Sequence, residues 1–149
     1  MKRKIISIPP KYFYLSIIII IAARFLLPQF NVIIFPYNVL GVILFLVGFY
    51  FIFWTWKIFK KYNTPENFDK STKLVTEGLF RFSRNPMYLG GFLILFGLFI
   101  FVGNLVSLLG PVLYFLFIHF MFIPFEEEKN EKTFGQEFID YKKRTRKWI

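Results

Sequence analysis

The feature that most constrains this chain is the absence of any charged residue between Arg84 and Glu126. Two further uncharged stretches run from Phe25 to Trp56 and from Tyr12 to Ala23. A helix needs ~20 apolar residues to cross the hydrocarbon core of a bilayer. With 56% hydrophobic and 23% aromatic residues among 149, the chain carries more apolar surface than one soluble core of this size can bury. The sequence therefore predicts an all-α fold, a polytopic membrane helix bundle.

Four membrane spans fit the pattern of apolar runs, prolines and glycines. We expect them within a single integral membrane domain (1–149), at approximately 11–27, 38–59, 86–102 and 105–123. Gly103-Asn104 is a breaker pair that predicts a short turn between the last two spans, and Pro124 is expected to end the fourth. Almost all polar residues then fall in a loop at 60–85 and a tail at 124–149.

The distribution of positive charge predicts the orientation of the bundle. Lysines and arginines precede the first span and follow the second and fourth, whereas the loops Gln29–Tyr37 and Gly103–Asn104 carry no charge. By the positive-inside rule, both termini, the loop and the tail are cytoplasmic. Arg24 is the exception, and we expect it to extend toward the outer interface. The net charge of +10 therefore indicates membrane topology and anionic lipid as a partner, not nucleic acid.

Aromatic residues recur in the tail at helical spacing, with lysines and arginines between them. They are Phe134, Phe138, Tyr141 and Trp148. This pattern predicts an amphipathic helix that lies along the cytoplasmic interface of the bilayer.

The segment 81–91, RFSRNPMYLGG, allows two interpretations. Asn85 is a favoured N-cap residue and Pro86 a favoured first helical residue. Arginines beside the resulting helix N-terminus would form an anion site, and Gly90-Gly91 would let a helix or ligand approach the backbone closely. The alternative is an ordinary positive flank on a capped helix with a small packing face, and local physics alone favours it.

Two features near the end of the fourth span also allow two interpretations each; the first-named is favoured less than its alternative for the glutamates, and the two are about even for the histidine. Glu126, Glu127 and Glu128 would stand at a helix C-terminus, where negative charge needs a cation or hydrogen-bond donors; the alternative is a solvated acidic turn paired with lysines. His119, the only histidine, either has a function or hydrogen-bonds a neighbouring helix. The chain has no cysteine, no glycine-rich nucleotide motif and no cluster with metal-ligand spacing.

A series of short segments follows in a definite order along the second half of the chain. They are Asn63-Thr64-Pro65, Lys73–Arg81 (KLVTEGLFR), Arg84–Gly90 (RNPMYLG), His119, Glu126-Glu127, Phe134-Gly135, Tyr141 and Trp148-Ile149. Together they resemble the isoprenylcysteine carboxyl methyltransferase and phospholipid methyltransferase superfamily of integral membrane enzymes, over roughly 64–149. The chain departs from the family pattern at Asn85, where many members have histidine, and at Glu128, Asn130 and Lys147.

The resemblance implies a methyltransferase that binds S-adenosylmethionine on the cytoplasmic side, between the RxxRNPMY and Glu-Glu segments. The implied catalytic residues are Arg84, Asn85, Tyr88 and His119; the implied cofactor-binding residues are Arg81, Pro86, Tyr88, Leu89, Gly90, His119, Glu126, Glu127 and Tyr141. The acceptor would be a carboxylate or amine of a lipid or lipid-modified, isoprenylcysteine-like molecule. No metal is expected. The identity of the acceptor and the oligomeric state stay open.

Two other functions stay open as well. A membrane reductase of the steroid-reductase type, with a nicotinamide cofactor, has a similar C-terminal half. A non-catalytic lipid-binding membrane protein could also keep the same scaffold.

Overall fold

The structure, a computed structural model, describes residues 9–62 and 73–149, and the regular elements in them are all helices joined by short loops. The helices are α2 (Pro9–Leu26), α3 (Leu40–Lys61), α4 (Pro86–Val102), α5 (Leu109–Phe117), α6 (Ile123–Phe134) and α7 (Gln136–Arg144). Shorter turns are η1 (Pro28–Phe30), η2 (Tyr37–Val39), η3 (Gly78–Arg81), η4 (Leu105–Leu108) and η5 (Ile118–Phe122). Two parts of the sequence argument lie outside the described residues: the positive charges before the first span at Lys2, Arg3 and Lys4, and the segment Asn63-Thr64-Pro65 with the loop lysine Lys70.

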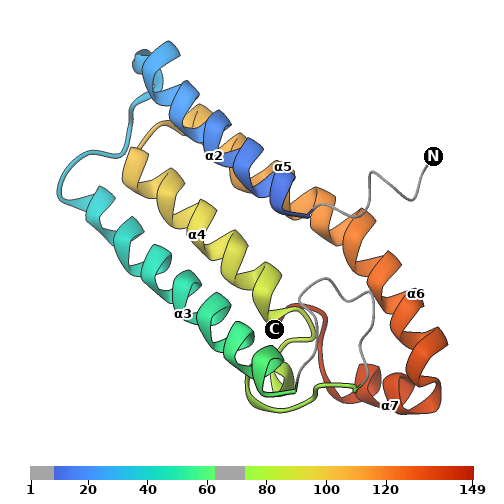
Figure 1. Cartoon of the computed structure of the whole chain (residues 1–149). Coiled ribbons are helices and arrows are strands. Elements are labelled where there is room, and N and C mark those ends of the chain that lie inside the picture. The colour runs from blue at the N-terminus through green and yellow to red at the C-terminus, as the bar shows by residue number, and fades with distance from the viewer. Residues whose placement is uncertain (1–8, 63–72) are drawn as a thin grey trace.

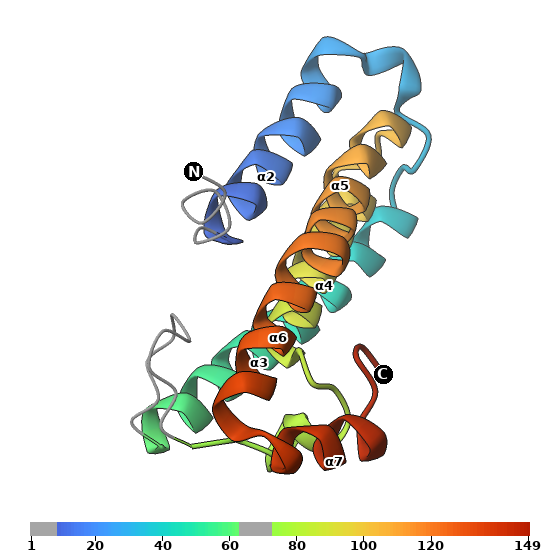
Figure 2. The ribbon, with the colours of Figure 1, turned by 90° about the vertical axis from the view of Figure 1, so that its right-hand side faces the viewer.

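The long helices run side by side, with α4 between α3 and the pair formed by α2 and α5 (Figure 1). Because η4, α5, η5 and α6 follow one another without a break, they form one continuous helical rod from Leu105 to Phe134. The short helix α7 lies across the end of the bundle where α3 ends and α4 begins, as both views show (Figure 2). That end carries the predicted polar tail and the described part of the predicted loop, 73–85.

Glycines allow α3 and α4 to pack backbone against backbone. A Cβ atom built on Gly48 would lie 2.6 Å from the carbonyl oxygen of Gly90, and one on Gly97 would lie 2.5 Å from that of Gly41. Gly91 faces the other way, where a Cβ atom would lie 2.5 Å from the hydroxyl of Tyr114 on α5. The prediction that Gly90-Gly91 admits a close helix neighbour is therefore confirmed.

Two of the described helices are long and apolar enough to cross a bilayer, Tyr37–Lys61 and Leu105–Phe134. The first matches the span expected at 38–59 to within two residues, and the second begins at the expected residue 105 but continues past 123. Pro86–Val102 is a shorter apolar helix with the bounds expected from the sequence, and α2 matches the helix expected at 11–27 to within two residues. The arrangement as four membrane spans remains our prediction.

The expected end of the fourth helix at Pro124 is wrong. The turn η5 is π-helical, since the N–H of Ile123 donates to the carbonyl of Ile118, five residues earlier. Helix α6 follows directly. Pro124 stands in the first turn of α6, a position at which the missing proline N–H is tolerated. The glutamates at 126–128 consequently lie near the start of α6, so the expectation that they oppose a helix C-terminus fails as well.

The tail does form an amphipathic helix, but its apolar face lies on the protein. Phe138 and Tyr141 of α7 are buried in a cluster with Phe59, Val75 and Phe80. The helix is also shorter than the aromatic spacing predicts. Gly135, with a φ of 54°, separates it from α6. The expectation of a helix whose apolar face rests on the bilayer is therefore corrected.

The turn at Gly103-Asn104 is as expected. Gly103 ends α4 with a φ of 75°, which suits glycine. The Asn104 amide is fully buried and donates to the carbonyl of Leu27 and to the Asn31 side chain, both at 2.8 Å. Arg24 donates to the carbonyl of Val102 at 3.1 Å, so it satisfies the C-terminus of α4 and has a structural role.

Candidate functional site

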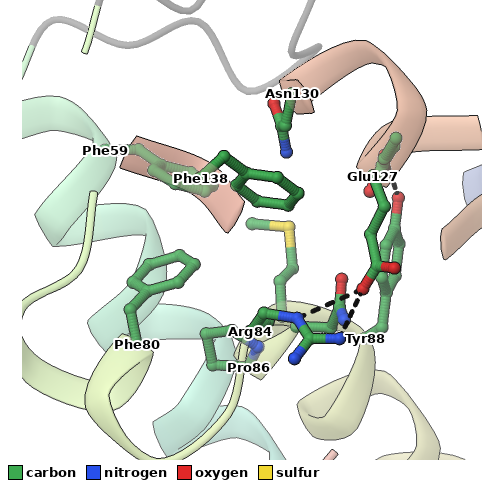
Figure 3. Close-up of a pocket in the computed structure, with 11 residues that line it drawn as sticks. Phe59, Phe80, Arg84, Pro86, Tyr88, Glu127, Asn130 and Phe138 are labelled. Carbon is green, nitrogen blue, oxygen red and sulfur yellow. Dashed lines mark hydrogen bonds and ion pairs between the residues drawn. The ribbon is translucent and has the colours of Figure 1, made fainter. Parts of the chain in front are cut away.

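A depression of about 430 Å³, which includes space open to solvent, lies between the start of α4 and the start of α6 (Figure 3). Segments far apart in the sequence contribute to it. The lining residues are Phe59, Phe80, Arg84, Asn85, Pro86, Met87, Tyr88, Glu126, Glu127, Asn130 and Phe138. We refer to it as the first depression.

Two neighbouring carboxylates of α6 face the start of α4. The hydroxyl of Tyr88 donates to Glu126 at 2.6 Å. Arg84 donates to one oxygen of Glu127 from Nη2 at 2.7 Å and from Nε at 3.2 Å. Arg84 lies just before the N-cap of α4 and Tyr88 in its first turn, so both donors reach α6 from the start of the same helix. With side chains of Arg84 and Glu127 only 10% and 15% exposed, this ion pair is well shielded from water.

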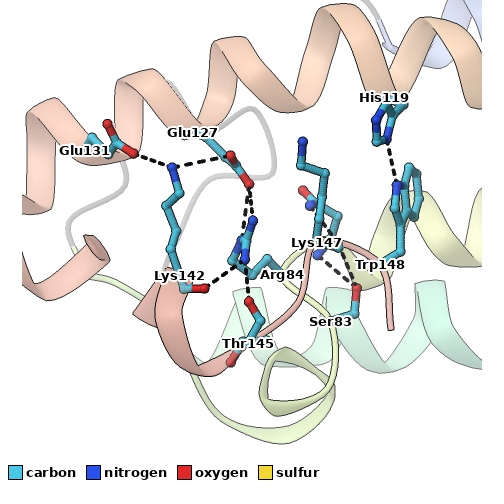
Figure 4. A network of polar contacts seen from close by, with 10 residues as sticks. Ser83, Arg84, His119, Glu127, Glu131, Lys142, Thr145, Lys147 and Trp148 are labelled. Carbon is cyan, nitrogen blue, oxygen red and sulfur yellow. Dashed lines mark hydrogen bonds and ion pairs between the residues drawn. The ribbon is translucent and has the colours of Figure 1, made fainter. Parts of the chain in front are cut away.

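The remaining contacts of Arg84 are directed to the tail (Figure 4). Its Nη1 donates to the carbonyl of Lys142 at 3.2 Å and to that of Thr145, and its backbone N–H donates to the carbonyl of Arg146 at 3.0 Å. The guanidinium is therefore engaged by Glu127 and by backbone oxygens. In this arrangement Arg84 orients Glu127 and the tail.

The N-terminus of α4 is left without a side-chain cap. Asn85 occupies the N-cap position, but its Nδ2 donates to the carbonyl of Lys147 at 3.0 Å. The expectation that its side chain caps the helix is therefore wrong. Pro86 and Met87 line the first depression, and no described side chain caps the first turn, so its backbone N–H groups and the helix dipole can serve an anion.

A second depression of about 400 Å³ adjoins the first and is largely aromatic. It shares Phe59, Phe80, Arg84, Asn130 and Phe138 with the first and adds Lys73, Leu74, Val75, Phe134 and Tyr141. The Tyr141 hydroxyl donates to the carbonyl of Phe80 at 2.6 Å. Burial raises the pKa of Tyr141, so its phenol remains a neutral donor that ties α7 to η3.

The structure places seven of the eleven site residues that the sequence singled out in the lining of the two depressions. The first depression is lined by Arg84, Asn85, Pro86, Tyr88, Glu126 and Glu127, and the second by Arg84 and Tyr141. Arg81 is exposed, whereas Leu89 and Gly90 are buried within the bundle; none of these three lines either depression.

His119 also lies outside both depressions. Its Nδ1 accepts a hydrogen bond from Nε1 of Trp148 at 2.9 Å, and its ring stacks on Phe115 with centroids 5.4 Å apart. The imidazole nitrogen that is engaged is therefore an acceptor, and the contact joins the helical rod to the tail. The geometry favours the interpretation that His119 hydrogen-bonds a neighbouring segment.

Sequence reasoning did not assign Phe59, Met87, Asn130 or Phe138 to the site. Asn130 stands four residues after Glu126, so helical periodicity would have placed it on the same face had α6 been predicted beyond Pro124. No comparable local signal exists for Phe59 and Phe138, because they reach the depression through packing between α3 and α7.

Comparison with known proteins identifies a family. The model of the phospholipid methyltransferase family matches residues 36–137, which contain every residue that lines the first depression except Phe138. An uncharacterized protein of Haemophilus influenzae is 36% identical over 63 residues, which are 42% of this chain and 100% of that protein. No solved structure matches.

Proposed function

Because the chain belongs to the phospholipid methyltransferase family, we propose that it is a membrane enzyme that uses S-adenosylmethionine to methylate a lipid. Family membership suggests a lipid methyltransferase, and the two long apolar helices agree with a membrane protein. The cofactor, the acceptor chemistry and the residues that act are the proposal. The acceptor group is a carboxylate or an amine of a lipid or lipid-modified molecule.

The observation that carries this proposal is the chemistry of the first depression. It combines two carboxylates with an uncapped helix N-terminus and aromatic walls. S-adenosylmethionine carries an ammonium, a carboxylate, a sulfonium and an adenosine. Glu126 and Glu127 suit the ammonium or the ribose hydroxyls, the first turn of α4 suits the carboxylate, and Phe59, Phe80 and Phe138 suit the adenine or sulfonium. The residues present therefore fit this cofactor.

When bound, S-adenosylmethionine supplies an activated methyl group for in-line displacement. The protein then has to orient both reactants and exclude water, which the aromatic residues shared by the two depressions are suited to do. A carboxylate acceptor needs no base. An amine acceptor has to lose a proton, and Glu126 can receive it, because Arg84 and Lys142 are directed to Glu127 while Glu126 is held by the neutral Tyr88 hydroxyl.

We further propose that the site faces the cytoplasm. In this arrangement the four helices at 11–27, 38–59, 86–102 and 105–123 span the bilayer, both termini are cytoplasmic, and the acceptor tail enters from the lipid. The charge distribution supports the orientation, since all nine acidic residues fall in the loop and tail.

The test is equilibrium binding of S-adenosylmethionine to the purified protein in nanodiscs. We expect saturable binding that is weakened about tenfold or more by Glu127→Gln, because a charge-assisted contact is lost. The matched control is Glu128→Gln, the exposed neighbour on the same helix, which should bind like the wild type. Transfer of a labelled methyl group into lipid extracts would then identify the acceptor.

Absence of binding to folded protein would overturn the methyltransferase proposal. Binding of a nicotinamide in its place would favour a reductase of the steroid-reductase type. Binding of neither cofactor would favour a non-catalytic lipid-binding protein.

A further inference from the structure

The segment after α7, Thr145–Trp148, folds back against the start of α4 and the helical rod; we call it the C-terminal strap (Figure 4). Its backbone carbonyls are held by side-chain and backbone donors of the segment RFSRNP. The Arg84 side chain donates to the carbonyl of Thr145, the Arg84 backbone N–H donates to that of Arg146, and the Asn85 side chain donates to that of Lys147 at 3.0 Å. Beyond Thr145, whose N–H still donates to the carbonyl of Tyr141, these donors hold the strap in place.

The end of the strap is fixed by Trp148. Its Nε1–H donates to Nδ1 of His119 at 2.9 Å, and its ring stacks on Phe115 with centroids 5.1 Å apart. Trp148 also packs against the core cluster that contains Tyr88 and Phe122. The contact thus joins the last residues of the chain to η5, the turn that precedes the two glutamates.

The strap is connected to both carboxylates of the first depression through one intervening side chain each. Glu127 is held by Arg84, and two of the backbone oxygens that Arg84 engages belong to the strap. Glu126 is held by Tyr88, which packs in the same cluster as Trp148. If the strap were released, the Arg84 guanidinium would lose the Thr145 carbonyl and the Arg84 backbone N–H would lose the Arg146 carbonyl, so Glu127 would lose a rigidly placed partner.

We propose that His119 and Trp148 are positioning residues for the cofactor site. Their hydrogen bond holds the C-terminal strap, the strap holds Arg84, and Arg84 aims Glu127 into the first depression. The inference rests on the proposed function and adds a role for two residues that line neither depression.

The test compares the dissociation constant of S-adenosylmethionine among variants in nanodiscs. Trp148→Phe keeps an aromatic ring for stacking but removes the N–H, and His119→Leu removes the acceptor. Each should weaken binding roughly threefold to tenfold, the loss expected for one hydrogen bond. The double variant should be no weaker than either single variant, because both changes break the same contact.

The conservative variant is His119→Asn, whose Oδ1 replaces Nδ1 as acceptor, and it should bind within about twofold of the wild type. The matched control is Trp56→Phe, an exposed tryptophan on α3, which should leave binding unchanged. Hydrogen exchange of the strap provides a second measurement that needs no ligand. It should be faster in Trp148→Phe and His119→Leu and unchanged in His119→Asn.

The outcomes separate the two proposals. Faster exchange of the strap in Trp148→Phe with unaltered affinity would overturn the positioning role while leaving the proposed function intact. Unaltered exchange in both His119→Leu and Trp148→Phe would overturn it too. If the wild type binds no S-adenosylmethionine, the proposed function fails. In that case, faster hydrogen exchange of the strap in His119→Leu and Trp148→Phe, but not in His119→Asn, would still show that the hydrogen bond between His119 and Trp148 holds the strap on the helical rod.

Discussion

Two asparagines at helix N-termini show how differently the two ends of the bundle use the same residue. Asn104, at the end of the bundle whose loops carry no charge (the uncharged end), caps η4 by accepting from the N–H of Val106 at 3.0 Å. Asn85, at the charged end, occupies the N-cap position of α4 but donates to the carbonyl of Lys147. The side chain of Asn104 therefore caps the N-terminus of η4, whereas the N-terminus of α4 has no side-chain cap and lies beside the first depression.

The same contrast extends to the surrounding polar groups. At the uncharged end, Asn104 is fully buried and its side chain is satisfied by Leu27, Asn31 and Val106. At the charged end, Glu126 and Glu127 line a depression where donors from a ligand can reach them. A hydrogen-bond network whose polar groups are all satisfied within the protein contributes to stability alone. A network that borders a depression contributes to stability and also to ligand binding. Substitutions at the two ends should therefore separate these quantities.

The largest effect is expected for Arg84→Ala. It leaves Glu127, which is 15% exposed, with Lys142 at 3.7 Å as its remaining ionic partner, and it also removes a donor from the tail carbonyls. Breaking a shielded pair from one side costs about 3 kcal/mol. We expect the midpoint of thermal unfolding in nanodiscs to fall by roughly 10 °C.

The control for this prediction is Arg81→Ala, which removes an exposed arginine three residues earlier. It should leave the unfolding temperature unchanged. A similar decrease for both variants would show that the loss of positive charge, and not the contact with Glu127, determines stability at this end.

Asn104→Ala should have the next largest effect. The substitution removes three hydrogen bonds and leaves buried partners unsatisfied, at a cost of about 2 kcal/mol. Affinity for S-adenosylmethionine should stay the same, as measured on protein that is still folded. Asn38→Ala is the matched control at the same end. It should cost less, because Nδ2 of Asn38 makes a long contact of 3.5 Å and its buried Oδ1 is unpaired.

A loss of affinity in Asn104→Ala comparable to that in Glu127→Gln would break the comparison between the two ends. It would mean that the two ends are coupled through the helices.

Much of the fold could be predicted from the sequence because its signals are local. Pro86 and Gly103 fix the bounds of α4, and the uncharged run between Arg84 and Glu126 indicates two apolar helices. The continuation of the rod past Pro124 could not be predicted in this way. A proline interrupts a regular α-helix, but here the π-helical turn η5 comes before Pro124 and the helix continues.

The candidate site was predictable to a different degree. The segments that form it follow from the resemblance to a family, and Arg84, Tyr88, Glu126 and Glu127 do line one depression. Their individual partners depend on where the tail lies. No local pattern indicates that Asn85 binds the carbonyl of Lys147 or that Trp148 reaches His119, because these contacts join residues far apart in the sequence.

Glu126→Gln tests the charged end of the bundle further, because it removes the charge of this side chain and keeps its shape. The amide oxygen can still accept from Tyr88, so the unfolding temperature should change little. Binding of S-adenosylmethionine should weaken by roughly tenfold, since a charged acceptor is replaced by a neutral one. Equal affinity of the variant and the wild type, measured by calorimetry, would exclude Glu126 from the cofactor contacts.

The smallest effect is expected for the surface pair Lys61–Glu77, 2.9 Å apart, whose side chains are 65% and 38% exposed. The hydrogen bond from Lys61 lowers the pKa of Glu77 below its usual 4.5, and the same bond raises the pKa of Lys61 above 10.5. A lowered carboxyl pKa contributes stability above pH 4.5 that is lost as the pH falls through the folded value. A raised lysine pKa contributes stability that is lost as the pH rises through its folded value.

Glu77→Gln should therefore lower the unfolding temperature between these limits, by roughly 1 °C or less, because exposed pairs contribute little. The difference from the wild type should vanish in strong acid and at high salt. A decrease as large as that of Arg84→Ala would mean that surface charge at this end matters as much as the shielded pair. In that case the contrast between the two ends would be one of net charge and not of an open site against a closed one.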